Sequence, residues 1–205
     1  MRASAGIAPS QRRLQRPPDF TGGRLERFDQ VFVRHGLAGA VLGAACLWVP
    51  ELRALLDETL TSLRLAPGRY LLAGLLLLGL MLCNAWRIDR RVEAATVGWV
   101  LYLLALASWE EWLFRLVVPA TLTDSGLPPG AAVMIANAAF GALHYFTLRW
   151  KWQWCLAAFV GGLALSRHLH EHADLAHIVL LHWVATYANT PRPPGSARRE
   201  LESGT

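Results

Sequence analysis

The chain has 205 residues, of which 54% are hydrophobic and only 17% are charged, and its mean hydropathy is +0.29. A soluble domain of this length carries charge on about a quarter of its residues. The composition therefore argues against an ordinary soluble domain and favours an all-α bundle of transmembrane helices. Arginines supply most of the net charge of +5 and lie at the ends of apolar segments, which disfavours nucleic-acid binding.

Six apolar segments follow one another along the chain, and we interpret each as a membrane span. The fifth is short, because about 20 helical residues are needed to cross the hydrocarbon core. The segments are 31–50, 69–86, 94–120, 130–148, 152–166 and 174–190. Together they predict one transmembrane domain over residues 31–190.

The basic residues predict how this domain is oriented. Residues 1–30 contain six arginines, and further basic clusters follow the second, fourth and sixth segments, whereas loops 51–68, 121–130 and 167–173 are less basic. The positive-inside rule then places both termini in the cytoplasm. We expect disordered tails at 1–30 and 191–205, and a location in a bacterial inner membrane.

The three cysteines, Cys46, Cys83 and Cys155, lie in three different apolar segments. Their odd number and the absence of metal-ligand spacing predict neither a disulfide framework nor a thiolate site.

Several ionisable residues lie where a membrane span should be apolar. The third segment contains LASWEEWLFRLVVP, with Glu110, Glu111 and Arg115 among apolar neighbours. Such residues cost roughly 2.5–3.5 kcal/mol each at the centre of a membrane helix, so they are functional candidates. Glu111 and Arg115 are four residues apart and can pair on one helix face. Glu110 is rotated about 100° from Glu111 and is predicted to lack that partner.

Two later segments add imidazoles. In NAAFGALHYF, Asn137, Gly141 and His144 fall on one helix face, and the glycine allows another helix to come close. In the last segment, His182 and Thr186 are one turn apart. Carboxylates and imidazoles brought together suit amide hydrolysis: the carboxylate takes a proton from water, and donors stabilise the oxyanion.

These motifs resemble those of the CAAX-protease and bacteriocin-processing (CPBP, or Abi) family of glutamic intramembrane proteases. EEWLFR resembles the EExxxR motif, FGALH resembles FxxxH, and the histidine of the last span resembles the third motif, HxxxN or HxxxD. The resemblance covers about residues 94–190. Three motifs in the right order on separate spans are fairly specific, although each alone is weak.

The resemblance implies an endopeptidase that acts without a cofactor on a peptide or protein substrate at the bilayer. Glu110 would be the general base on the catalytic water, assisted by His144, and Glu111 with Arg115 would form a supporting pair. His182 would donate to the oxyanion.

The fourth-residue companion of His182 is Thr186 instead of Asn or Asp, which is a departure from the family pattern. A threonine hydroxyl can still donate one hydrogen bond, and Asn189 lies one turn later. We expect Thr186, Asn137 and Phe140 to support the substrate or the oxyanion. Eukaryotic relatives act on prenylated CAAX tails, whereas the Arg-, Ala- and Leu-rich composition suggests a bacterial protein with a sorting-signal or bacteriocin-type substrate.

Other interpretations remain open from the sequence. The charged residues of the third span could form a structural ion pair, and each histidine could be an ordinary core residue. Zinc held by His144, His182 and Glu110 is a less favoured alternative, since no HExxH motif occurs. A non-catalytic membrane scaffold or immunity-type protein of the same fold is the main rival function. A transporter is disfavoured because the two halves show no inverted repeat.

Two further expectations concern geometry. The histidine-rich stretch RHLHEHAD is interpreted as a solvated connector between spans and not as a metal cluster. The predicted span ends place Glu110 in the outer half of the third span and His144 about 8 Å from the inner end of the fourth. Their meeting would then require a tilt, a break near Ser108 or different span ends.

Overall fold

The computed structural model describes residues 28–194, which form helices joined by short connections and contain no strand. The predicted disordered tails lie almost entirely outside the described residues. The segments are α1 Phe28–Val31, η2 Phe32–Gly36, α2 Leu37–Cys46, α3 Pro50–Thr59, α4 Thr61–Leu65, α5 Pro67–Asp89, α6 Ala94–Glu111, η3 Trp112–Val117, α7 Val118–Asp124, α8 Pro129–Thr147, α9 Trp152–His172 and α10 Leu175–Asn189. The prefix η marks a π-helical turn.

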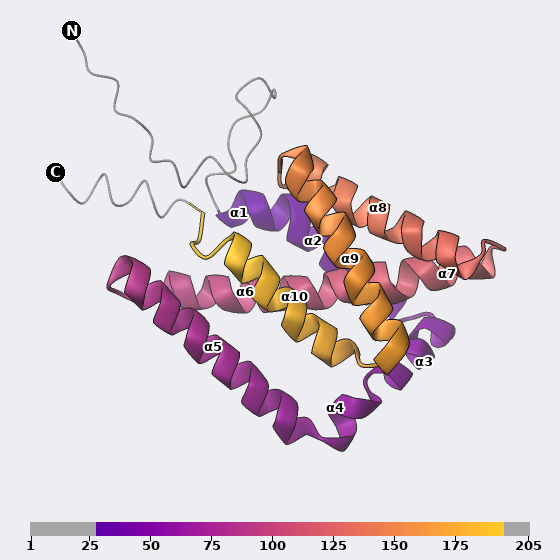
Figure 1. Cartoon of the computed structure of the whole chain (residues 1–205), viewed down its shortest axis with the longest axis horizontal. Coiled ribbons are helices and arrows are strands. Elements are labelled where there is room, and N and C mark those ends of the chain that lie inside the picture. Colours follow the sequence, from indigo (N-terminus) through magenta and orange to yellow (C-terminus); the bar gives the residue numbers. More distant parts are fainter. Residues whose placement is uncertain (1–27, 195–205) are drawn as a thin grey trace, which may run out of the picture.

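Each predicted apolar segment lies within or closely overlaps one helical rod. The first corresponds to α1, η2 and α2, which together form the N-terminal rod (Phe28–Cys46). The third corresponds to α6, η3 and α7, which continue without interruption from Ala94 to Asp124. Figure 1 shows α6 and α7 as one straight rod across the molecule. α10 packs against this rod and against α5, while α8 packs on α7 and α9. The α6–η3–α7 rod is therefore the element on which the other helices assemble.

Two loop predictions were wrong. Residues 51–68 were expected to form a loop, but α3 and α4 occupy most of this stretch, and α3 leaves the N-terminal rod at an angle of 103°. Leu52, Leu55 and Leu56 of α3 pack against the core beside η3, which explains why the stretch is helical. The expected connector at 167–173 is instead the last turns of α9, which ends at His172.

The core consists of two clusters along the central rod. One gathers Trp99, Val100 and Leu103 of α6 with Trp183 of α10, and the other gathers η3 with residues of α9 and α10. The indole nitrogen of Trp183 donates to the Val100 carbonyl at 2.9 Å, which ties α10 to α6. The short stretch between the clusters carries the adjacent glutamates.

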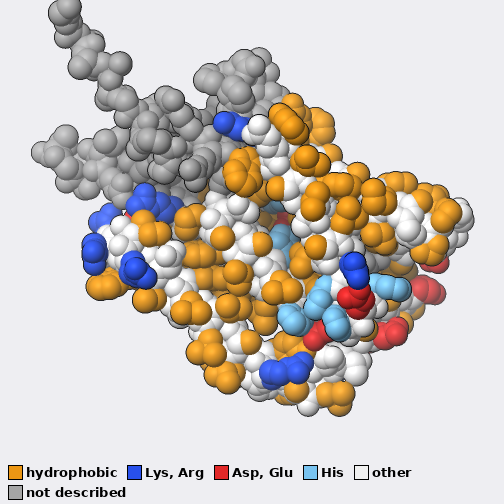
Figure 2. Space-filling model, viewed as in Figure 1, with side chains coloured by type: hydrophobic (Ala, Val, Ile, Leu, Met, Phe, Trp, Pro, Cys, Tyr) orange, Lys and Arg blue, Asp and Glu red, His pale blue; other side chains and the backbone are white. Residues whose placement is uncertain are grey.

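Length and hydropathy together qualify one helix within residues 28–194 as a membrane span, the 23-residue α5, or two if the bent pair Phe28–Cys46 and Pro50–Thr59 counts as one span. Leu71, Leu72, Leu75 and Leu76 leave an exposed apolar stripe on α5. Apolar side chains also cover much of the face shown in Figure 2, while Lys and Arg gather beside one end of α5. The six-span arrangement and its orientation stay predictions.

Candidate active site

The adjacent carboxylates lie at the C-terminal end of α6, between the two core clusters. Only 5% of Glu110 and none of Glu111 is exposed. The π-helical turn η3 follows at once and carries Arg115, which is also buried. π-Turns within α-helices are frequent at functional sites. Buried carboxylates have to be neutralised by partners, so their contacts define the site.

Glu111 lies against two nitrogen-bearing side chains. Its Oε2 lies 3.2 Å from Nε of Arg115, so the predicted pair four residues apart is present. Its Oε1 lies 2.7 Å from Nδ1 of His182. This close contact lacks hydrogen-bond geometry, but a lone pair on Nδ1 would repel the carboxylate at this distance, so Nδ1 of His182 carries hydrogen. Nε2 of His182 then faces the other glutamate, 3.6 Å from Oε2 of Glu110.

Glu110 is surrounded by three imidazoles. Besides His182, Nε2 of His144 lies 3.8 Å from Oε1. The third is His35, whose Nε2 makes a 2.8 Å hydrogen bond with Oε1. Glu110 thus has a partner of its own, which a residue of the N-terminal rod supplies and the sequence did not predict.

His144 is fixed by its own helix. Its Nδ1 donates to the Phe140 carbonyl at 2.8 Å, which leaves Nε2 facing Glu110. The rings of Phe140 and Trp150 pack on the imidazole, each with centroids 4.6 Å away. Gly141 on the same face allows α9 to come close, since a methyl group there would lie 2.8 Å from the Cys155 carbonyl oxygen. The predicted role of this glycine is thus confirmed.

The three residues expected to support the substrate or the oxyanion have different contacts. The Phe140 ring makes edge contact with His182 and lies under Arg115, whose Cζ is 4.4 Å from its centroid. Asn137 is fully buried and donates to Val133 and Ser166. The Thr186 hydroxyl donates to the His182 carbonyl at 2.9 Å, so its one proton is used within its own helix.

The predicted span ends placed Glu110 and His144 at different depths, but the observed helix ends bring them to the same level. The third rod is unbroken at Ser108, whose hydroxyl donates to the Leu104 carbonyl, and it runs on to Asp124. α8 begins at Pro129 and runs back along α7. At 1.5 Å per residue, Glu110 and His144 each lie about 21–23 Å from the turn that joins the two rods. They therefore meet at the same level without a break.

His35 is the site residue that sequence reasoning missed. It is 4% exposed and lies on η2, far from the motifs of residues 94–190. The signal was present: an ionisable residue lies inside the first predicted span, the criterion that identified the others.

Among residues 28–194, the three groups able to share a metal ion are His35, Glu110 and His144, whose ligand atoms all lie within 4.8 Å of one another. This set differs from the zinc alternative considered from the sequence, because His35 takes the place of His182. Two imidazoles and a carboxylate are ligands that zinc accepts.

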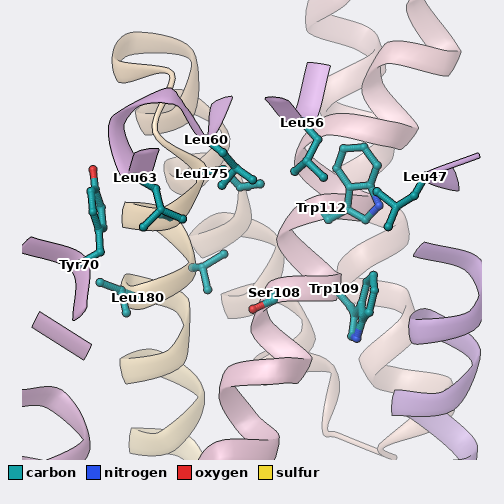
Figure 3. A pocket seen from close by; sticks show the side chains of 12 residues that line it. Leu47, Leu56, Leu60, Leu63, Tyr70, Ser108, Trp109, Trp112, Leu175 and Leu180 are labelled. Carbon is teal, nitrogen blue, oxygen red and sulfur yellow. The ribbon is translucent and has the colours of Figure 1, made fainter. Parts of the chain in front are cut away.

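An apolar cavity of about 370 Å³ lies on another side of the same rod (Figure 3). Its lining includes Trp109 and Trp112, which flank the carboxylates, together with leucines of α3, α4 and α10. None of Glu110, Glu111, His144 and His182 lines it. The cavity is therefore a hydrophobic neighbour of the site and is separate from its polar groups.

A comparison with known protein families finds a match in the C-terminal part of the chain. Residues 92–188 match the family described as type II CAAX prenyl endopeptidase Rce1-like. Residues 92–188 form an Rce1-like domain of the CPBP family. No curated protein and no solved structure shows a significant match to the chain.

The Rce1-like domain contains the residues of the first two motifs and the histidine of the third, and it spans α6 to α10. The family is one of membrane-embedded CAAX-type proteases, so the domain belongs to a class of peptide-bond hydrolases. His35 precedes the domain in the chain, yet it contacts the central glutamate.

Proposed function

We propose that this chain is an intramembrane endopeptidase in which Glu110 activates a water molecule against a peptide bond. The observation that carries the proposal is the placement of His144 and His182 within 4 Å of the two oxygens of one buried carboxylate. Water molecules bridge polar groups at such separations. The proposal rests also on the protease family to which residues 92–188 belong.

In the first step the Glu110 carboxylate takes one proton from a water that His144 also holds. Nδ1–H of His144 is committed to the Phe140 carbonyl, so the free Nε2 accepts the second hydrogen of this water. The hydroxide oxygen forms a bond to the substrate carbonyl carbon. The carbonyl π pair moves to oxygen, giving a tetrahedral oxyanion and a protonated Glu110.

His182 is placed to stabilise that oxyanion. With a hydrogen on the Nδ1 that lies 2.7 Å from Glu111, a second proton on Nε2 makes a donor on the side that faces Glu110. When the intermediate collapses, the C–N bond breaks and Glu110 returns its proton to the leaving amine. Glu110 then ends as a carboxylate, ready for another water.

Glu111 and Arg115 act behind this donor. The Glu111 carboxylate stabilises a positively charged His182 and holds its ring orientation, while Arg115 neutralises the carboxylate. The proposed mechanism uses no metal ion, because the carboxylate itself removes the proton. Zinc bound by the group that contains His35 is the alternative, and a chelator separates the two.

The substrate we propose is the C-terminal or leader segment of a protein presented from the bilayer, in a bacterial inner membrane with both chain termini in the cytoplasm. The exposed leucine stripe of α5 supports contact with lipid. A sorting-signal or bacteriocin-type peptide fits the inferred source better than a prenylated tail.

The test compares protein termini in membrane and secreted fractions of cells that express the wild type, Glu110→Gln or Glu58→Gln. Glu58 is an exposed carboxylate of α3 and gives a matched control for the same change. We expect specific termini to disappear with Glu110→Gln and to persist with Glu58→Gln and after chelator treatment. Termini unaffected by Glu110→Gln would refute the protease proposal, and their loss on chelation would refute the metal-free mechanism.

A second candidate function is a non-catalytic scaffold or immunity protein with the same fold. The observation that favours it is Thr186, which replaces the Asn or Asp of the family motif. Its hydroxyl donates its one hydrogen to the His182 carbonyl of its own helix. A scaffold would keep its cellular phenotype in Glu110→Gln, provided that the protein is present at the normal level.

A further inference from the structure

His35 reaches Glu110 from outside the domain that the family comparison identifies. It lies on η2 of the N-terminal rod, and its side chain is 1% exposed where it meets Glu110. Its two ring nitrogens have different partners: Nε2 lies 2.8 Å from Glu110 Oε1, and Nδ1 lies 2.7 Å from the hydroxyl of Thr147. These partners decide where its protons are.

The Thr147 hydroxyl fixes the first proton. Its Oγ1 lies 2.7 Å from the Leu143 carbonyl oxygen, which can only accept, so the hydroxyl hydrogen points there. Toward His35 the hydroxyl oxygen must therefore accept, and Nδ1 of His35 donates to it. The order of donation is His35 to Thr147 to the backbone of α8.

The second proton follows from this assignment. With hydrogen on Nδ1, a neutral His35 offers only a lone pair on Nε2, and an ionised Glu110 offers only lone pairs on Oε1. Two acceptors 2.8 Å apart repel each other, so one proton must lie between them. When it resides on His35, the result is an imidazolium that donates to a carboxylate, the form that Glu110 needs as a base.

We propose that His35 is a positioning residue of this active site, which holds Glu110 as a carboxylate and fixes its Oε1 so that the remaining lone pairs face His144 and His182. This inference rests on the proposed function for its catalytic meaning. The contact also neutralises Glu110, as Arg115 does for Glu111, so that each buried carboxylate has a cation of its own.

The N-terminal rod is built to hold His35 at this place. Gly36 and Gly43 lie on one face of the rod and contact α6. A methyl group on Gly36 would lie 2.5 Å from the Tyr102 hydroxyl oxygen, and one on Gly43 would lie 2.5 Å from the Trp109 ring. The indole of Trp112 donates to the Gly43 carbonyl at 3.1 Å. A methyl group at Gly39 meets nothing within 4 Å. The rod therefore approaches α6 through two specific glycines.

The test uses the purified full chain in lipid vesicles and compares His35→Leu, His35→Gln and His170→Leu, with His170 as an exposed control on α9. Infrared spectra identify the carboxyl band of Glu110 by its loss in Glu110→Gln. We expect this band to shift in His35→Leu and to stay in place in His170→Leu. This readout needs no substrate, so it succeeds or fails independently of the protease proposal.

Activity is measured in cells as the rate at which the Glu110-dependent protein termini are formed. We expect His35→Leu to lower its rate about 10- to 100-fold, the usual effect of removing a partner that orients a functional group. His35→Gln should recover part of the rate because its amide can donate to Glu110. If His35→Leu does not fold, Gly36→Ala against Gly39→Ala tests the same contact, with loss expected only for the former.

Three results would overturn the inference. One is an unchanged Glu110 band in His35→Leu, and another is processing at the wild-type rate in that variant. The third is a zinc ion bound at one per chain in the purified protein and lost with His35→Leu, which would make His35 a metal ligand.

Discussion

Replacing Gly162 with alanine should destabilise the protein and disable the site together. Gly162 faces the buried side of α9, where a methyl group would lie 2.3 Å from Oδ1 of Asn137 and 3.1 Å from Nη2 of Arg115. An ordinary carbon–oxygen contact is about 3.3 Å, so the helix or Asn137 must move by about 1 Å. Overpacking of this kind costs about 1–3 kcal/mol. Displacing Arg115 also disturbs the carboxylate that it neutralises.

The neighbouring Gly161 provides the matched control, because a methyl group there meets nothing within 4 Å. Removing a glycine from a helix interior gains about 0.5–1 kcal/mol, so Gly161→Ala should be neutral or slightly stabilising. Gly162→Ala should therefore lower the thermal midpoint of the purified protein, whereas Gly161→Ala should leave it unchanged or raise it slightly. A misplacement of about 1 Å near a reaction centre costs up to about 10²-fold in rate, which the processing assay would show for Gly162→Ala alone. Equal midpoints for the two variants would refute the close packing of α9 on Arg115.

Two further predictions concern the charges of the core and the start of α10. Arg115→Met should destabilise the fold by about 3–5 kcal/mol in denaturant unfolding, because it leaves a buried carboxylate uncompensated. Adding Glu111→Gln should restore part of that loss, and a double variant no more stable than Arg115→Met would contradict the pairing. Asp174 caps α10 by accepting from the backbone N–H of His177 at 3.0 Å, and its other oxygen accepts from the Tyr70 hydroxyl, so Asp174→Ala should cost more than the roughly 1 kcal/mol of a cap alone. Asp124→Ala, at the C-terminal end of α7, should cost nothing in the same thermal unfolding assay, and an equal loss would exclude a capping effect.

The sequence was sufficient to find the helices that carry the site. Apolar segments located every long rod, and charged residues among apolar neighbours pointed to Glu110, Glu111 and Arg115, whose burial and contacts the structure describes. A buried ionisable residue is informative because it is costly to place in an apolar environment. His35 met the same criterion, but it lies beside Arg34 near the start of its segment and matched no motif.

Other features depend on tertiary packing and could not be read locally. The helices α3 and α4 form in a stretch of mixed polarity because its leucines find the core beside η3. The two π-turns, which carry His35 and Arg115, have no marker in the residue pattern. Helix ends were misjudged because apolar character stops before the helix does, as at Asp124 and His172.

Removing a single oxygen from Thr147 changes the protons at the site without touching the carboxylates. Thr147→Val keeps the volume and removes the acceptor of the His35 Nδ1–H bond. A neutral His35 can then place its one hydrogen on Nε2 and still donate to Glu110, so the Glu110-dependent processing should fall less than in His35→Leu. A rate equal to or below that of His35→Leu would contradict the proposed order of hydrogen bonds.

The most direct measurement is an experimental structure of the full chain in lipid at a resolution that reveals ordered water. The account predicts that Glu110 meets His35 by a hydrogen bond and shares one water with His144, close to Nε2 of His182. A Glu110 side chain that faces lipid, or that lies more than one bridging water from both His144 and His182, would contradict it.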